Sequence, residues 1–203
     1  MFYANDKDRK KIRPIFSGQM AFCGCCGESV IGKCGEIVPR YWSHLSGTDC
    51  DSWAEPMTQW HANWQDILEG EESANIEVPI ERNGYVHRAD AILKSGTIIE
   101  LQHSAISPAE IREREIYYGV RLVWIFDIKE AYNNDRFELR KKLGNYKYTF
   151  RWKHPKKSIT FATRRVYLDF GNDSLLYLIK IYPGPPCAGI GELISRHELT
   201  FNL

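Results

Sequence analysis

The sequence predicts an α/β protein in which a mixed sheet is flanked by helices. Three observations support this fold class. Cysteines crowd into the first quarter of the chain, helical and strand periodicities alternate through its middle, and strand patterns dominate its last third. We therefore expect a small cysteine-rich module at 1–51, an α/β core at 52–130, and a basic, strand-rich extension packed on that core at 131–203.

The first segment is rich in glycine and cysteine and has no helical periodicity. Its cysteines are Cys23, Cys25, Cys26, Cys34 and Cys50. In a reducing compartment, clustered cysteines near a histidine indicate a metal site before they indicate disulfides. Cys23-x-x-Cys26 has zinc-knuckle spacing, and His44 with Cys50 can complete a tetrahedral site, which four protein ligands would make structural. The alternative is a set of reduced, buried cysteines without metal.

The core begins with a helix that three strands follow. Pro56 suits the first position of a helix over 57–68, because its missing N–H would be unpaired there anyway. Apolar residues recur at helical spacing from Trp60 to Leu68, so the indoles are expected in the core. The strands are predicted at 76–82, 85–93 and 97–102, joined by turns at Asn83-Gly84 and Lys94-Ser95-Gly96.

A second helix and a buried strand complete the core. Ser107 can cap the helix, Pro108 fits its first turn, and Glu110 has the spacing of a capping box. Gly119 is the natural stop, and the apolar run 120–128 suits a central strand. Beyond the core we expect a short helix at 135–143 and strands at 146–153, 158–163, 166–170 and 175–182.

The third strand carries the chemistry. Side chains two positions apart share a face, so Glu100 and Gln102 point the same way, and Asp90 lies on the preceding strand. An acid in an apolar strand is costly unless it is paired or binds a metal. Two neighbouring carboxylates suit Mg²⁺, which can activate water and offset the charge on a phosphate. The alternative is a pair of acids exposed at a sheet edge.

Ordered motifs surround this triplet. They are Cys-Gly-Cys-Cys-Gly at 23–27, Lys-Cys-Gly at 33–35, Tyr-Trp-Ser-His at 41–44, Cys-Asp-Ser-Trp-Ala-Glu at 50–55, Thr-Gln-Trp-His-Ala-Asn-Trp at 58–64, His-Arg-Ala-Asp at 87–90, Glu-Leu-Gln-His-Ser-Ala-Ile-Ser at 100–107 and Trp-Ile-Phe-Asp at 124–127. With these motifs the chain resembles the CoiA-like competence protein family, whose members carry a PD-(D/E)XK-type nuclease domain behind a small Cys/His module.

The resemblance implies a restriction-endonuclease-like core and a metal-dependent nuclease site. Asp90 and Glu100 would hold Mg²⁺ or Mn²⁺, Gln102 would orient water or phosphate, and Glu55 and His61 would complete the site from the first helix. Gln102 stands where the superfamily motif has lysine, and an amide cannot neutralise charge.

Four residues are candidates to supply the missing positive charge. They are His61, His87, Arg88 and His103. For His87 the alternative is a strand-face residue hydrogen-bonded to the backbone.

The resemblance also bears on the zinc ligands. Cys34 lies in the family's Lys-Cys-Gly element and is the alternative to Cys50. Where the family tends to have His-x-x-His, this chain has Tyr41-Trp42-Ser43-His44, which leaves one candidate ligand fewer.

Charge is segregated along the chain. Residues 136–165 hold eleven Lys or Arg and one acid, a local charge of +10, although the whole chain has a net charge of +1. Such a stretch suits a polyanion partner or, alternatively, a solvated basic face. Its aromatic residues could stack on bases, or could simply mark a strand. The candidate nucleic-acid contacts are Lys141, Lys142, Arg151, Lys153, Lys156 and Lys157.

The expected function is therefore metal-dependent hydrolysis of DNA, single- or double-stranded, with a structural zinc module. One rival is a non-cleaving, single-stranded-DNA-binding competence factor with a nuclease fold, and another is a zinc-stabilised regulator that docks a protein. A homo-oligomer and a recombination or defence partner stay open. No apolar run approaches the ~20 residues of a membrane helix, and the N-terminal residues lack a signal-peptide core, so we expect a cytoplasmic protein.

Overall fold

The computed structural model describes residues 1–47, 50–72, 74–142 and 146–202 as a mixed α/β chain with a mixed sheet. The chain divides into two compact units, Met1–Ile92 and Leu93–Leu203. The three-part organisation expected from the sequence remains a prediction.

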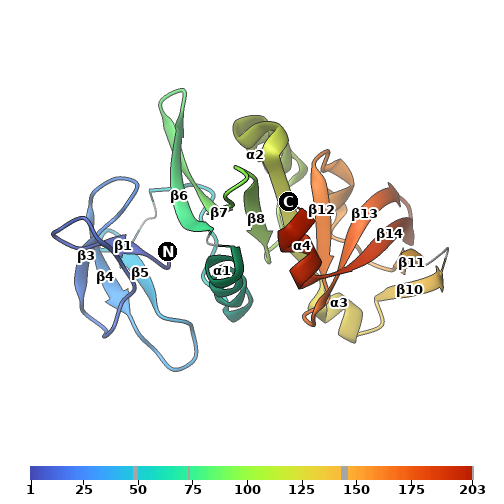
Figure 1. Cartoon of the computed structure of the whole chain (residues 1–203), viewed down its shortest axis with the longest axis horizontal. Coiled ribbons are helices and arrows are strands. Elements are labelled where there is room, and N and C mark those ends of the chain that lie inside the picture. Colours follow the sequence, from blue (N-terminus) through green and yellow to red (C-terminus); the bar gives the residue numbers. More distant parts are fainter. Residues whose placement is uncertain (48–49, 73, 143–145, 203) are drawn as a thin grey trace. The chain divides into compact units, whose positions relative to one another are not determined.

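The first unit opens with a five-stranded antiparallel sheet, drawn in blue in Figure 1. The strands are β1 (Ala4–Asn5), β2 (Lys11–Ile12), β3 (Met20–Phe22), β4 (Ser29–Lys33) and β5 (Tyr41–His44), in the order β2-β1-β3-β4-β5. Ala21, Val30 and Trp42 are buried in its core, together with Cys23. This small core has few large side chains, so cross-links through the cysteines can add to its stability.

A helix and a hairpin complete the first unit. They are α1 (Gln59–Glu72), β6 (Asn75–Arg82) and β7 (Tyr85–Ile92). The helix starts later than Met57, because the Thr58 hydroxyl accepts the His61 N–H at 3.2 Å and caps the first turn. Asn83 and Gly84 adopt φ of 54° and 79°, the left-handed pair that the predicted hairpin turn requires.

The second unit is built on seven strands in the order β10-β11-β14-β13-β12-β9-β8. Their bounds are β8 (Ile98–Gln102), β9 (Leu122–Asp127), β10 (Phe137–Lys142), β11 (Lys147–Trp152), β12 (Arg165–Asp169), β13 (Ser174–Tyr182) and β14 (Cys187–Ser195). Strand β9 runs parallel to β8 and to β12, and the remaining pairs are antiparallel. Trp124, Ile125 and Phe126 of β9 are completely buried, as expected for a central strand.

Three helices belong to this unit: α2 (Pro108–Tyr118), α3 (Lys129–Asn133) and α4 (Arg196–Asn202) (Figure 1). Ser107 caps α2 by accepting the Glu110 N–H, Pro108 lies in the first turn, and Gly119 ends the helix with a φ of 81°. The Glu110 carboxylate does not complete the expected capping box. It is turned toward Arg114, at 2.5 Å.

Two predicted elements are wrong. The helix expected at 135–143 is strand β10, in which Phe137 pairs with Trp152 and Leu139 with Phe150. The strand expected at 158–163 contains a 3₁₀ helix, Lys157–Phe161. Next to this short helix, the Glu115 carboxylate of α2 accepts the N–H groups of Thr163 and Arg164 at 2.8 and 3.0 Å. Those donors therefore bind a helix side chain and not a neighbouring strand.

Among the described residues, no helix combines the length and the apolar character needed to span a bilayer.

Candidate metal centre and acidic site

Four side chains of the first unit gather into a cluster that could hold a metal such as zinc. They are Cys23, Cys26, His44 and Cys50, and their ligand atoms all lie within 4.8 Å of one another. Cys23 follows β3, and a turn closed by the Gly27 N–H on the Cys23 carbonyl at 3.0 Å brings Cys26 back beside it. His44 comes from the end of β5, next to β4.

The donor set fits a tetrahedral structural zinc site. The sulfurs of Cys23 and Cys50 are 3.7 Å apart, and the Cys26 sulfur is 3.3 Å from His44 Nε2. A hydrogen bond with Cys25, together with backbone N–H groups that outweigh burial, lowers the pKa of the Cys23 thiol to about 4. Burial and this neighbouring charge raise the pKa of Cys50. A bound cation would offset the repulsion between the Cys23 and Cys50 thiolates, so that several thiolates can share one centre.

The remaining cysteines lie outside this ligand set. Cys34 bonds through its backbone to Ser17, with the Cys34 N–H 2.9 Å from the hydroxyl oxygen. Cys25 contributes its N–H to the Cys23 sulfur at 3.3 Å, and its own thiol lines a nearby cavity. Cys187 is buried in β14. The geometry therefore groups Cys50, and not Cys34, with Cys23, Cys26 and His44.

A second group of chemically active side chains lies between α1 and the β6–β7 hairpin. His61 Nε2 of α1 is 2.7 Å from an Asp90 carboxylate oxygen on β7. Ile76 pairs with Ala91 and Val78 with Ala89, so Glu77 lies at the level of Asp90 on the neighbouring strand. Burial lowers the pKa of His61, but Asp90, Glu77 and Glu55 outweigh it, and the net shift is upward. These acids therefore favour the protonated form of the imidazole.

Glu77 is held by the main chain of the N-terminal residues. Its carboxylate accepts the N–H of Phe2 at 2.6 Å and of Tyr3 at 2.9 Å. The residue has a φ of 48°, an unusual value for a non-glycine residue within a strand. These contacts fix the carboxylate and leave it less able than Asp90 to bind a cation.

In the second unit, Glu100 and Gln102 lie on β8, and only 3% and 1% of their surfaces are exposed. The Glu100 carboxylate is 2.7 Å from the guanidinium of Arg114 on α2, and the Gln102 amide donates to the Ser104 carbonyl at 3.1 Å. A carboxylate at this depth needs a cationic partner, and Arg114 supplies it.

The other candidate cations have local partners. His87 lies 2.8 Å from Asp51 and stacks on Trp53 with ring centroids 3.3 Å apart, so it anchors the segment before α1. His103 in the second unit is 2.7 Å from Asp127. Arg88 lies on the same face of β7 as Asp90 and lines the cavity that Cys25 also borders.

The basic stretch of the second unit is only partly exposed. Lys142 and Lys153 face solvent, Arg151 is half-buried, and Lys156 donates to the His103 carbonyl. The side chains of Lys141 and Lys157 lie outside the described residues. Phe150 and Trp152 pack on Phe137 with centroids 5.1 and 5.4 Å away, so these aromatics form core and cannot stack on bases.

Sequence reasoning missed Arg114 and Glu77. Arg114 had a signal, because it is spaced to share the face of α2 with buried Ile111 and Tyr118, where an unpaired cation is not expected. Glu77 had none, since its partners are main-chain groups far away in sequence. No protein-family model, no curated protein and no solved structure matches the chain.

Proposed function

We propose that the chain is a Mg²⁺- or Mn²⁺-dependent nuclease of the CoiA-like, PD-(D/E)XK type that hydrolyses phosphodiester bonds in DNA. The observation that carries this proposal is a pair of poorly exposed acids, Asp90 and Glu100, on successive strands of the chain. The segment between them is tight, because the Leu93 N–H binds the Thr97 carbonyl at 2.9 Å. The proposal requires both carboxylates to bind one cation.

Each side chain has a stated task in this proposal. Asp90 and Glu100 hold the cation, and His61 fixes the orientation of the Asp90 carboxylate through the 2.7 Å contact. Gln102 orients the attacking water or a phosphate oxygen through its amide. The bound cation supplies an activated water and offsets the negative charge that develops on the phosphate. Glu55 adds negative potential beside His61.

Cleavage of plasmid and linear DNA with Mg²⁺ or Mn²⁺ tests the proposal. We expect Asp90→Ala and Glu100→Ala each to lose more than about 100-fold in rate, above the loss typical of outer-shell partners. Matched controls are Asp66→Ala and Glu113→Ala, which remove exposed acids from α1 and α2. Equal activity in all five proteins would rule out the assigned site.

The second candidate is a DNA-binding protein with a nuclease fold that does not cleave. The Glu100–Arg114 contact favours it, because an acid already compensated by arginine does not need a metal. Binding of single-stranded DNA without metal and without cleavage supports this candidate. If substitution of Lys141, Lys142, Arg151 and Lys153 by neutral residues abolishes this binding, the DNA-binding surface is the basic stretch.

A further inference from the structure

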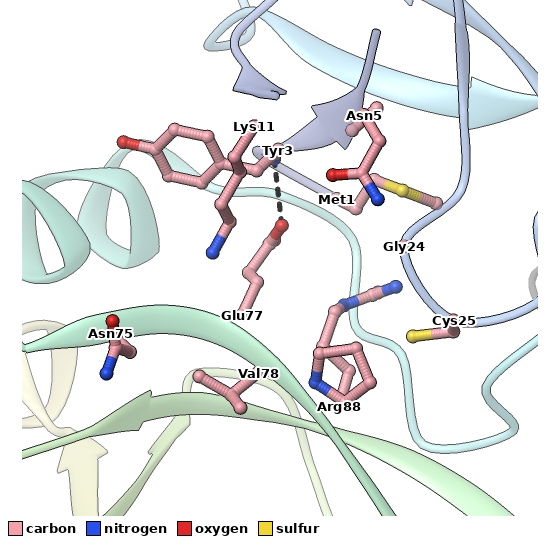
Figure 2. Close-up of a pocket in the computed structure, with 12 residues that line it drawn as sticks. Met1, Tyr3, Asn5, Lys11, Gly24, Cys25, Asn75, Glu77, Val78 and Arg88 are labelled. Carbon is pink, nitrogen blue, oxygen red and sulfur yellow. Dashed lines mark hydrogen bonds between the residues drawn. The ribbon is translucent and has the colours of Figure 1, made fainter. Parts of the chain in front are cut away.

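A cavity of about 270 Å³ lies in the first unit, between the cysteine-rich sheet and β6–β7. Figure 2 shows that Lys11 enters it from the N-terminal strands and that Arg88 extends from β7 toward Gly24 and Cys25, while Glu77 lies between the two cations. Val78 and Pro79 supply an apolar wall. The cavity thus combines cations with a small hydrophobic surface, as sites for small polar ligands do.

Lys11 and Arg88 both line the cavity, and their positive charges oppose each other. Burial lowers the pKa of Lys11. The charges of Glu77 and Glu69 oppose that change, and the charge of Arg88 lowers the pKa further. The Glu77 carboxylate offsets part of this repulsion, and a phosphate oxygen that contacts both the lysine and the arginine would offset the remainder and replace the water that burial removes.

Glu77 offsets one of the two positive charges, and the main chain already occupies its carboxylate. Both of its carboxylate oxygens accept main-chain N–H groups, from Phe2 and Tyr3, as the dashed line to Tyr3 in Figure 2 illustrates. With Lys11 and Arg88 positive and Glu77 negative, the charged side chains of the lining sum to 2 − 1 = +1. The amides of Asn5 and Asn75 add neutral donors to the same wall.

Two residues that line the cavity, Arg88 and Glu77, lie close to the Asp90 group. Arg88 and Asp90 are two positions apart on β7 and share a face, and Glu77 acts electrostatically on both Lys11 and His61. A ligand bound by Lys11 and Arg88 therefore lies beside the carboxylate to which the proposed function assigns a catalytic metal.

We propose that Lys11 and Arg88 bind a phosphate group of the nucleic-acid strand in this cavity. That the phosphate belongs to a nucleic acid rests on the proposed function. An internal diester and a terminal monoester share the chemistry that these two cations recognise, because arginine and lysine both bind phosphate oxygens by charge-assisted hydrogen bonds.

The test measures fluorescence anisotropy of labelled single-stranded oligonucleotides at low salt, without added Mg²⁺ or Mn²⁺. Lys11→Gln and Arg88→Gln should each weaken binding by about 10-fold or more, the value for a lost hydrogen bond to a charged group. The double substitution Lys11→Gln/Arg88→Gln should reduce the salt dependence by about one phosphate contact, because both cations bind the same phosphate group. Lys11→Arg keeps the charge and should retain most of the affinity.

Matched controls are Lys10→Gln and Arg82→Gln, which neutralise exposed cations of the same unit outside the cavity. Circular dichroism and thermal melting confirm that each variant folds. Binding equal to wild type in Lys11→Gln and Arg88→Gln would overturn the proposal. An equal loss in the two control variants would also overturn it, because the effect would then be general electrostatics.

Two further arms identify the source of the phosphate. Tighter binding of a 5′-phosphorylated than of a 5′-hydroxyl oligonucleotide, with the difference lost in Lys11→Gln, assigns a terminal monoester. Equal binding of both, weakened in the variants, assigns an internal diester. Inorganic phosphate should compete with the oligonucleotide for wild type. It should not compete for the double variant Lys11→Gln/Arg88→Gln.

Binding and cleavage together distinguish a failure of the phosphate site from a failure of the nuclease assignment. Binding that depends on Lys11 without any cleavage retains the phosphate site and removes the nuclease. Normal cleavage by Lys11→Gln with unchanged KM removes the phosphate site and retains the nuclease.

Discussion

Arg114 and Glu100 form an ion pair at 2.7 Å although their side chains are only 5% and 3% exposed. Burial lowers the pKa of Arg114, but Glu100 and Glu110 together raise it by more. The net pKa of Arg114 is therefore above its ordinary value. A buried pair of this kind contributes little net stability while it is intact, but removing one partner leaves an uncompensated charge in the interior. The stability of the second unit should therefore depend strongly on this arginine.

We expect Arg114→Ala to lower the free energy of unfolding by about 3–5 kcal/mol, the usual cost of breaking a buried pair. Urea denaturation measures it. Arg112→Ala is the matched control, because it removes an exposed arginine from the same helix and should change stability by less than about 0.5 kcal/mol. Equal losses in the two variants would show that Glu100 does not need its cation.

Tyr3 gives the first unit a dependence on alkaline pH. Burial and the hydrogen bond with Glu69 raise the pKa of Tyr3 to about 12, against an opposing effect of Arg13. Since the folded pKa lies above the unfolded value of about 10, this contribution is present below pH ~10 and is lost as pH rises through the folded value.

Wild type should therefore lose more stability between about pH 9 and about pH 11.5 than Tyr3→Phe does, as measured by urea denaturation at each pH. The phenylalanine variant lacks the titrating group and otherwise shares every change of charge. Parallel losses in the two proteins would contradict the assignment.

At the scale of the helix or strand, the sequence predicted an element correctly where its signal was local. Asn83-Gly84 specified the hairpin, and Ser107, Pro108 and Gly119 specified both ends of α2. They failed at residues 137–142, where helix-forming residues obscured the alternation of Phe137 and Leu139 that pairs with β11. Long-range pairing, and not propensity, decides such a segment.

Strand β14 was not predicted, because its glycines argue against a strand. Gly189 lies opposite Phe150 of β11 and Ile181 of β13. A Cβ at this position would meet the Lys180 carbonyl oxygen and the Phe150 ring, each within 2.4 Å. The glycine is needed for the close approach of these strands, a requirement that exists only in the folded sheet.

Gly189→Ala should therefore destabilise the protein by about 1–3 kcal/mol, the range for overpacking a core. Thermal and urea unfolding measure this change. Gly184→Ala serves as the control, because the nearest atom to its Cβ is 3.6 Å away, an ordinary contact. A variant at Gly189 as stable as the control would contradict the observed packing of β14.

At the scale of the whole molecule, the cysteine cluster links strand ends that otherwise share only a small core. Its spacing could be recognised in the sequence because Cys23 and Cys26 lie in one turn, whereas the choice between Cys34 and Cys50 needed the fold. The helical spacing of Arg114 indicated that it is buried and needs a partner, whereas the Glu77 contacts could not be predicted, since their partners are main-chain groups distant in the chain.

We expect one zinc ion per chain, measured by elemental analysis of the purified protein. Cys50→Ser should lose the metal and lower the melting temperature of the first unit, because structural zinc contributes directly to folding. Cys34→Ser is the matched control and should keep the metal. Retention of zinc by Cys50→Ser together with its loss from Cys34→Ser would reverse the assignment.

Binding of Mn²⁺ tests the central claim most directly, because the nuclease proposal requires Asp90 and Glu100 to share one cation. Electron paramagnetic resonance counts the bound Mn²⁺ in zinc-saturated protein. We expect one high-affinity ion in wild type and in the controls Asp66→Asn and Glu113→Gln, and none in either Asp90→Asn or Glu100→Gln. Unchanged Mn²⁺ binding in Asp90→Asn or in Glu100→Gln would contradict the shared site.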